Sequence, residues 1–511
     1  MTLNVTVRVA PDLAPKARYV FAVLSTHWGV PVRFVEQPEP GFNLVYGTRK
    51  DTDGDAVHLL CDPEQYSPSV HCVALQAHGS WLWAPHKCAV EQADIVGSIF
   101  RLLTFLDETQ VDEAARDRRG NFTTQALSPA RKSMAATPLV EIESERLFET
   151  VCRTQPAWRG LRMSRWPAGK KYAFLLSHDT DAITLGAPSE MAYNFAKAVL
   201  RRDATSFRMF AAGFKFLGRA DRNPLFGFPL WRRLEGSRLR SCFYLFVRPK
   251  GVKRDLNDCR SSVDNQPIDW SILSKMADDG WEFGVHASIH AKGNRAALQT
   301  AKKYVESKLA RPIAGIRHHY WAIDWRNPHS TFRNQAEAGF RYDASIAWRD
   351  VPGFRAATCL PFQPFDFDTN QPVHMYEVPT VLMDGHIRAP GKTCEEAAAD
   401  GLAVIERVKQ HGGAACLDWH TESACDQYRY QGDVPILERI IESVLADSEA
   451  WVTTPQNLVR HWDERSRELS GTDLKDCASL SASPEARVSC SIGSGFKSAS
   501  LQQEALQCAK Q

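Results

Sequence analysis

The sequence predicts an α/β fold, a distorted (β/α) barrel of about seven parallel strands preceded by a small α/β domain. Apolar strand-like runs recur through the second half of the chain, and helical or loop-rich stretches separate them. Shorter strand-like and helical runs alternate before them. Strands that alternate with helices indicate parallel βαβ units, and seven or eight of them suit a barrel. The runs are residues 172–177, 242–247, 281–286, 313–319, 341–347, 375–382, 413–420 and 450–455.

The composition divides the chain into four parts. Residues 1–130 alternate short β-like and helical runs, of which 93–108 is the clearest amphipathic helix, and they predict an α/β accessory domain. A stretch rich in polar and small residues then predicts a linker or helical connection over 131–165. Residues 166–463 contain the barrel strands and predict the main domain. Residues 464–511 have few large apolar side chains, so we expect a largely disordered tail.

The overall charge is nearly balanced, with 62 basic and 60 acidic side chains. This balance argues against a general nucleic-acid or membrane-surface binder, although a small local basic patch is compatible with it. No uninterrupted apolar run reaches about 18 residues, so we expect no integral membrane segment. The 13 cysteines include no CxxC pair, and no secretory signal is evident, which favours reduced thiols and a cytoplasmic location.

Two carboxylates end the first barrel strand, Asp179 and Asp181 in the segment 175–182. Residues two apart in a strand point to the same face, and the carboxyl end of a barrel strand is the usual place for an active site. One carboxylate could hold a metal ion while the other acts as a base. The alternative is a pair of aspartates that cap the following helix.

Two histidines end a second strand, His286 and His290 in the segment 281–291. A separation of four places both imidazoles on one side of a helical turn, a common spacing for two ligands of one metal. Ala287 stands where a zincin protease has its glutamate, which excludes that class. With Asp181 these residues would form a His₂Asp site open to water, as a catalytic zinc requires. The alternative is two surface or capping histidines.

Two further strand ends supply a candidate acid and a candidate cation. His420, in the segment 412–422, could protonate a leaving amine from the other side of the substrate. Arg317, in the segment 314–321, could hold the base carboxylate ionised and oriented. The alternatives are a core or capping histidine and a surface ion pair.

In order and spacing, residues 170–462 resemble the polysaccharide deacetylases, the family 4 carbohydrate esterases that share the NodB homology domain. Ser-His-Asp-Thr-Asp at 177–181 resembles the family's first motif in a D-x-D form, which implies that Asp179 is the base and Asp181 a metal ligand. His-Ala-Ser-Ile-His at 286–290 resembles the second motif, and this implies that both of its histidines are ligands.

The later motifs of that family are similar to three more segments. Arg317-His318-His319-Tyr320 resembles R-x-P-Y with a histidine at the proline position, which implies that Arg317 orients the base and that Tyr320 contacts the substrate oxygen through its N–H. The segment 376–386 resembles a strand whose acidic residue, here Asp384, orients the catalytic histidine. Leu-Asp-Trp-His at 417–420 resembles the final motif, which implies that His420 is the general acid. Trp419 beside it could stack on a sugar, or pack in the core.

The resemblance implies a metal-dependent hydrolase that removes an N-acetyl group from an amino-sugar-containing saccharide or precursor. The family default is one zinc ion, although a His₂Asp site can hold other divalent ions. Residues 94–108 and 116–122 resemble the accessory domain of a bacterial subgroup associated with surface-polysaccharide biosynthesis. The alternatives are an amidase or O-acetyl esterase of the same fold, and a catalytically silent glycan-binding protein.

Overall fold

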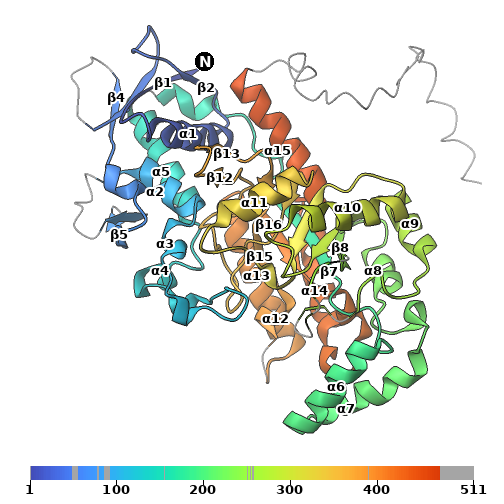
Figure 1. Ribbon diagram of the computed structural model, residues 1–511. Coiled ribbons are helices and arrows are strands. Elements are labelled where there is room, and N and C mark those ends of the chain that lie inside the picture. The colour runs from blue at the N-terminus through green and yellow to red at the C-terminus, as the bar shows by residue number, and fades with distance from the viewer. Residues whose placement is uncertain are drawn as a thin grey trace, which may run out of the picture. The chain divides into compact units, whose positions relative to one another are not determined.

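The computed structural model (Figure 1) describes residues 2–48, 56–77, 80–85, 93–154, 156–249, 251–253, 255, 258–259, 261–388 and 391–471. Residues 1–470 form one compact unit, which ends with helix α15 (Pro455–Ser470). The first residues of the predicted tail therefore belong to a helix, and from residue 472 onwards the tail lies outside the described residues. Among the described residues, no helix is long and apolar enough to cross a membrane.

The N-terminal part contains a small parallel sheet of strand order β2-β1-β3-β4 and an antiparallel hairpin, β5-β6. Helix α1 ends at Trp28, and the next residue, Gly29, caps it. The Gly29 N–H donates to the Ser25 carbonyl, and its left-handed φ of +70° turns the chain out of the helix. The elements are β1 (Leu3–Arg8), α1 (Ala14–Trp28), β2 (Val32–Phe34), β3 (Asn43–Gly47), β4 (Val57–Leu60), β5 (Cys72–Ala77), β6 (Ser80–Pro85), α2 (Ile95–Leu103), α3 (Leu106–Thr109), α4 (Pro129–Ser133) and α5 (Leu139–Thr154).

The amphipathic helix predicted over 93–108 is two helices in the structure, α2 and α3. Phe105 between them adopts a left-handed φ of +59°, which interrupts the helical hydrogen bonds. Its ring packs edge-on against Trp325 at 5.5 Å and stacks with Phe332 at 6.4 Å. Packing against the second half of the chain therefore offsets the cost of the strained backbone, and the sequence period could not show this.

The second half of the chain alternates strands and helices, as predicted. The elements are β7 (Tyr172–Asp179), α6 (Pro188–Arg201), α7 (Ala204–Gly213), α8 (Phe228–Glu235), β8 (Cys242–Val247), α9 (Trp270–Asp278), β9 (Glu282–Ala287), α10 (Arg295–Leu309), β10 (Gly315–His318), α11 (Pro328–Glu337), β11 (Tyr342–Asp343), β12 (Phe365–Asp366), β13 (Gln371–Pro372), β14 (Tyr376–Glu377), β15 (Thr380–Met383), α12 (Asp384–Ile387), α13 (Cys394–Gln410), β16 (Ala414–Asp418), α14 (Asp433–Ala446), β17 (Ala450–Val452) and α15.

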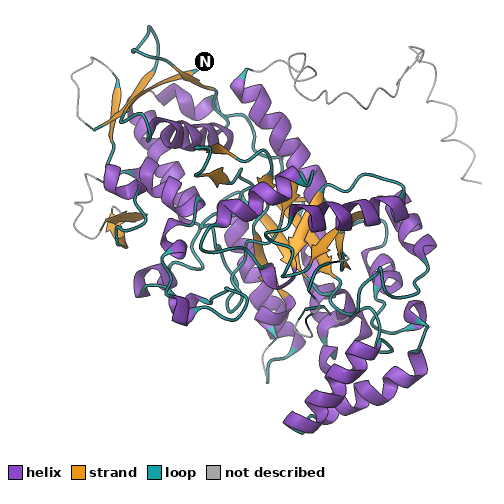
Figure 2. Cartoon of the chain, in the orientation of Figure 1, coloured by secondary structure: helices purple, strands orange, loops and turns teal. Residues whose placement is uncertain are grey.

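A parallel sheet forms the centre of this part, with strand order β14-β11-β10-β9-β8-β7-β16-β15 and with β17 also paired to β7. Its two edge strands, β14 and β15, are separated by only two residues in the chain, so the sheet must curl until its edges approach each other. Figure 2 shows the strands grouped at the centre with helices around them. The predicted fold class, a distorted α/β barrel of parallel strands, is confirmed, and the barrel stays open between β14 and β15.

The hydrophobic core has separate regions inside and outside the curled sheet. Side chains such as Leu175 and Tyr244 fill the inside, while Phe243 and Leu417 pack outward against the helices. A further core region joins the N-terminal part to residues 323–375 of the second half. The regions predicted as residues 1–130 and 166–463 thus share apolar contacts within one compact unit.

Parallel pairing places the carboxyl ends of the strands at one edge of the barrel. Polar residues follow the apolar part of β7, β9, β10, β15 and β16 at this edge. The fold therefore gathers the chemically active side chains of segments that lie more than 200 residues apart in the chain.

Candidate metal centre and catalytic cleft

Asp181 lies between two imidazoles that come from different strand ends. His286 Nε2 is 3.0 Å from Asp181 Oδ1, and His319 Nε2 is 3.3 Å from Asp181 Oδ2. His286 belongs to β9, and His319 follows β10 directly. The thiol of Cys259 is 3.4 Å from Asp181 Oδ1. Donor atoms of all four residues lie within 4.8 Å of one another, close enough to share one metal ion.

The opposite ring nitrogens of both histidines are held by fixed acceptors. His286 Nδ1 donates to the Arg317 carbonyl at 3.0 Å, and His319 lies with Nδ1 2.8 Å from Asp258 Oδ1. Asp258 also accepts a hydrogen bond from the Ser288 hydroxyl. Metal-binding histidines are usually oriented in this way, with one nitrogen donating to a carbonyl or carboxylate while the other faces the ion. These residues therefore fit a metal site.

The charges around Asp181 are those of a cation site. Burial by itself would raise the pKa of Asp181, but His319, His286 and His420 hold that pKa well below its usual range. Burial would likewise lower the pKa of His319, and the carboxylates of Asp181 and Asp258 raise it to about 9. The raised pKa of His319 and the lowered pKa of Asp181 both reflect the attraction between a cation and a carboxylate at this place. A divalent ion could take the place of the protons on the Nε2 atoms.

The structure does not bring His290 to this group. Strand β9 ends at Ala287, and a turn follows instead of a helix, so the helical spacing assumed for His286 and His290 does not apply. His290 Nε2 is 3.2 Å from Asp255 Oδ2 and faces a different cavity. His319 is the second histidine of this group instead.

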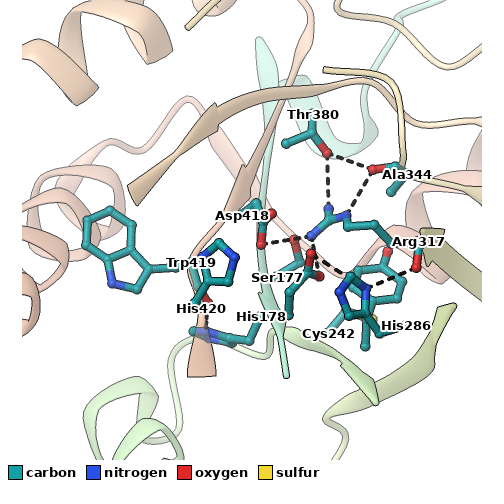
Figure 3. A network of polar contacts seen from close by, with 12 residues as sticks. Ser177, His178, Cys242, His286, Arg317, Ala344, Thr380, Asp418, Trp419 and His420 are labelled. Carbon is teal, nitrogen blue, oxygen red and sulfur yellow. Dashed lines mark hydrogen bonds and ion pairs between the residues drawn. The ribbon is translucent and has the colours of Figure 1, made fainter. Parts of the chain in front are cut away.

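Arg317 joins the predicted base to a second carboxylate, Asp418. Figure 3 shows Arg317 between Asp418 and the pair Ala344 and Thr380. Arg317 Nη1 is 3.0 Å from Asp179 Oδ1 and 3.1 Å from Asp418 Oδ1, and all three side chains are buried. Nε donates to the Ala344 carbonyl at 2.9 Å, and Nη2 donates to the Thr380 hydroxyl at 3.1 Å. The contact expected between Arg317 and Asp179 is therefore present, and Asp418 is an additional partner.

One guanidinium between two buried carboxylates leaves an excess of negative charge. Burial and the neighbouring Asp179 raise the pKa of Asp418 well above its usual range. Asp418 is therefore the carboxylate of this pair whose protonated form is favoured, because burial and the nearby Asp179 both oppose a second negative charge. The arrangement sets apart the two carboxylates that share Arg317.

His420 contacts Asp384 through Nδ1 and faces Asp181 with Nε2. His420 Nδ1 is 3.0 Å from Asp384 Oδ2, and its backbone N–H donates to the same oxygen at 3.1 Å. His420 Nε2 is 3.6 Å from Asp181 Oδ2. Burial would lower the pKa of His420, but Asp384, Asp181 and Asp418 raise it well above its usual value. The predicted Asp384–His420 pair is present, and it favours the protonated form of the imidazole.

Two adjoining cavities of about 220 and 230 Å³ open onto these groups. Both are lined by Asp181, His319, Tyr320, Met383 and His420. The first also touches Tyr193, Cys259, Asp384, Arg388, Glu422 and Tyr430, and the second also touches Asp179, Trp321, Arg349 and Asp418. We call the two cavities together the cleft. A base candidate, an acid candidate and the metal-binding group all face it.

The two residues predicted to contact the substrate are placed differently. Tyr320 lines the cleft in a left-handed conformation with φ +57°, and its ring lies between the guanidinium groups of Arg119 and Arg349 at 4.0 and 5.1 Å. Trp419 is fully buried in the core behind the sheet and does not line the cleft. Side chains alternate along extended backbone, so with Asp418 pointing inward Trp419 must point outward.

Four residues of the site were missed by the sequence reasoning. His319 lies two positions after Arg317, and Asp418 lies two positions before His420, so the strand period could have identified both. Asp258 and Cys259 come from the loop after β8, and no local signal marks them.

No protein-family model and no curated protein matches this sequence. Among solved structures, the chain is similar to a Mycobacterium smegmatis protein described as a polysaccharide deacetylase, with 19% identity, a TM-score of 0.40 and coverage of 59% of this chain and 93% of that one. Puue allantoinase is 14% identical, with a TM-score of 0.38 and coverage of 58% and 92%. Agd3, described as a novel carbohydrate deacetylase, is 8% identical, with a TM-score of 0.32 and coverage of 91% and 88%. These likenesses concern the fold, and carbohydrate deacetylases are among the structures that share them.

Proposed function

We propose that this protein is a metal-dependent hydrolase that removes an N-acetyl group from an amino-sugar-containing saccharide. One observation carries the proposal. Asp181, His286 and His319 point three oriented donor groups at one place in a cleft that also exposes Asp179 and His420. Solved structures of carbohydrate deacetylases with a similar fold are consistent with it.

Asp181, His286 and His319 would hold the ion, with Cys259 as a further donor. Zinc suits imidazole, carboxylate and thiolate donors, and when bound it would polarise the acyl oxygen and make a water more acidic. The Arg317 carbonyl binds Nδ1 of His286, and the Asp258 carboxylate binds Nδ1 of His319. These contacts keep the Nε2 atoms of both imidazoles turned toward Asp181.

Asp179 takes the proton of the attacking water in this proposal. Its carboxylate faces the cleft, and Arg317 fixes its orientation at 3.0 Å. The pKa of Asp418 is raised by burial and by Asp179, which favours its neutral form and leaves Asp179 as the carboxylate assigned to this role. The water oxygen then forms a bond to the acyl carbon as its proton moves to Asp179.

His420 supplies the proton for the leaving nitrogen. Asp384 keeps the imidazole protonated and directs Nε2 toward the cleft. The carbon–nitrogen bond breaks as the proton moves from Nε2 to the amine, and the products are acetate and a free amino sugar. Tyr320 and the other aromatic residues of the cleft offer flat apolar surfaces to a sugar ring.

We place the reaction in the cytoplasm, on a precursor of a surface polysaccharide. Scattered cysteines without a CxxC pair, as this sequence has them, are typical of reduced thiols. The metal's identity and this biosynthetic role are parts of the proposal.

Acetate release from chitin oligosaccharides, measured with the zinc-loaded and the chelator-treated protein, tests the function. We expect release by the zinc-loaded protein, loss after chelation and recovery when zinc is restored. An O-acetylated xylan in a parallel assay separates amide from ester hydrolysis. Faster release from the ester would replace the N-deacetylase proposal with an esterase. No release from either substrate, by protein that holds its metal, would contradict the proposal.

A further inference from the structure

Helices α6 and α7 form a hairpin, which together with the residues that follow it up to Leu217 carries most of the exposed large apolar side chains. Of the nine such side chains among the residues whose exposure the structure describes, six lie within residues 195–217, and Leu200 is 82% exposed. We call these six the apolar ridge. They are Phe195, Val199, Leu200, Phe207, Phe214 and Leu217.

The apolar ridge is nearly continuous across both helices. The Phe195 ring on α6 lies 5.1 Å from that of the half-buried Phe210 on α7, and Phe210 lies 5.3 Å from Phe214. Val199 follows Phe195 by one helical turn, so it extends the same face. Figure 1 shows α6 and α7 side by side at the bottom of the view, away from the barrel strands. An exposed patch of this kind usually marks an interaction surface.

The base of the hairpin is packed firmly, so the exposure does not come from a loose segment. Asp203 caps α7 by accepting hydrogen bonds from the backbone N–H groups of Thr205 and Ser206. A Cβ at Gly186 would lie only 2.3 Å from the carbonyl oxygen of Phe216, so the chain approaches too closely there for a larger residue. Met209 is buried in a small core beneath α7.

Basic side chains surround the apolar ridge. Residues 191–219 contain six lysines and arginines and only one acidic residue, Asp203. The whole chain has a basic excess of only two. The local excess of five therefore exceeds that of the entire protein and lies around its largest group of exposed apolar side chains. The basic residues are Lys197, Arg201, Arg202, Arg208, Lys215 and Arg219.

The hairpin also reaches the cleft. Tyr193 of α6 lines the cleft beside Asp181 and His420. The next residue, Asn194, accepts a hydrogen bond from Arg429 at 2.7 Å, and Arg429 precedes Tyr430, which lines the cleft as well. A surface bound by the apolar ridge would therefore be held near the mouth of the cleft.

We propose that the apolar ridge docks the protein on the surface of an anionic lipid bilayer. Apolar and aromatic side chains would enter the interface while the basic residues contact lipid headgroups, as in helices that lie in the plane of a membrane. A second copy of the chain fits less well, because a two-fold contact would place one basic hairpin against another. The nearly balanced overall charge gave no indication of this local surface.

The docking stands independently of the reaction. A second consequence rests on the proposed function. If the protein is a deacetylase, docking brings its cleft close to saccharides that are attached to lipids. Vesicle binding and acetate release are separate measurements, so a failure of one proposal can be told from a failure of the other.

Co-sedimentation with vesicles tests the docking. The full chain is mixed with vesicles of equal parts phosphatidylcholine and phosphatidylglycerol, or of phosphatidylcholine alone. We expect binding to the mixed vesicles that weakens with salt, and much weaker binding to phosphatidylcholine. The variant Leu200→Ser/Phe207→Ser/Phe214→Ser should bind at least about tenfold more weakly.

Two further variants complete the design. Leu161→Ser/Met163→Ser also removes exposed apolar side chains, but away from the hairpin, and it should bind like the wild type. Arg201→Glu/Arg208→Glu keeps the apolar ridge and should lose the preference for anionic vesicles. This second variant also tests the proposal if the serine variant fails to fold, as thermal unfolding would show.

Three outcomes would overturn the docking proposal. The wild type could fail to sediment with the mixed vesicles, or the folded hairpin variants could sediment as well as the wild type. Sedimentation velocity without lipid could instead show a dimer that the serine substitutions dissociate, in which case the apolar ridge is an interface between copies.

Discussion

His319 Nε2 lies 3.3 Å from Asp181 Oδ2, whereas His290, which the spacing of the sequence predicts as a ligand, contacts Asp255. We therefore expect His319→Ala to weaken metal binding more than the roughly 10–100-fold that loss of a supporting hydrogen bond costs. His290→Ala serves as the control and should bind metal like the wild type. Zinc content after dialysis against a competing chelator measures both. Equal zinc loss in the two variants, or loss in His290→Ala alone, would disprove this ligand set.

The Asp179–Arg317–Asp418 arrangement predicts a large effect on stability. Arg317→Met leaves two buried carboxylates without their cation, so we expect a loss of about 3–5 kcal/mol in the free energy of unfolding at neutral pH. The loss should shrink in mild acid, where protonation of Asp418, whose pKa is raised, removes negative charge from the pair. Arg311→Met removes an exposed partner of Asp278 and should cost less than about 1 kcal/mol. Urea unfolding at two pH values measures these differences, and a pH-independent loss would contradict the explanation.

Asp179 and Asp418 should differ in their effect on the reaction. Asp179→Asn removes the proposed proton acceptor, and kcat for acetate release should fall by about 10²–10⁴-fold with little change in KM. Asp418→Asn keeps a neutral side chain that can occupy the place of the protonated acid, so we expect a smaller decrease. If Asp418→Asn proves the more damaging variant while its metal content stays normal, the two roles must be exchanged.

Asp384 should act only through His420. We expect His420→Ala to lower kcat by about 10²–10⁴-fold, and Asp384→Asn to lower it less. The double variant should be no slower than His420→Ala, because a positioning residue has no effect once the residue it positions is gone. Asp400→Asn, an exposed change on α13, is the control. Fully additive decreases in the double variant would show that Asp384 has a separate role.

Glu143 should make the stability of the protein decrease with rising pH. Burial raises the pKa of Glu143 from 4.5 to about 8, despite hydrogen bonds from Ser98 and from the Trp83 N–H. The folded protein thus holds a proton that the unfolded chain releases above pH 4.5. The free energy of unfolding therefore falls between pH 4.5 and about 8, by at most about 1.4 kcal/mol per pH unit from this group.

Glu143→Gln should reduce that slope, because the amide keeps the hydrogen bonds and has no proton to lose. Glu149→Gln, which changes an exposed glutamate on the same helix, should leave the slope unchanged. Urea unfolding across this pH range measures the slope. An unchanged slope in Glu143→Gln would show that Glu143 is ionised in the folded protein.

Much of the site followed from the sequence because it depends on strand ends. Apolar runs define the strands, and parallel strands bring their carboxyl ends to one edge, so Asp179, Asp181, His286, Arg317 and His420 were expected to lie together. All five lie at the cleft or in direct contact with residues that line it. The fold class followed from the same alternation of strands and helices.

The local backbone decided two of the remaining residues. The four-residue spacing of His286 and His290 favours a shared metal only on a helix, and here a turn follows β9. Trp419 faces the core because its neighbours on either side face the cleft. Neither outcome can be obtained from the spacing of residue types alone.

The sequence by itself determined the strands, their order of alternation with helices and the polar residues that end them. Only the tertiary structure decided which of those residues meet. His319 reaches Asp181 because β10 pairs with β9, Asp258 arrives from the loop after β8, and Asp418 shares Arg317 because β16 pairs with β7. These contacts join residues between 61 and 138 positions apart, and their distances depend on strand pairing and curvature, which periodicity along the chain does not contain.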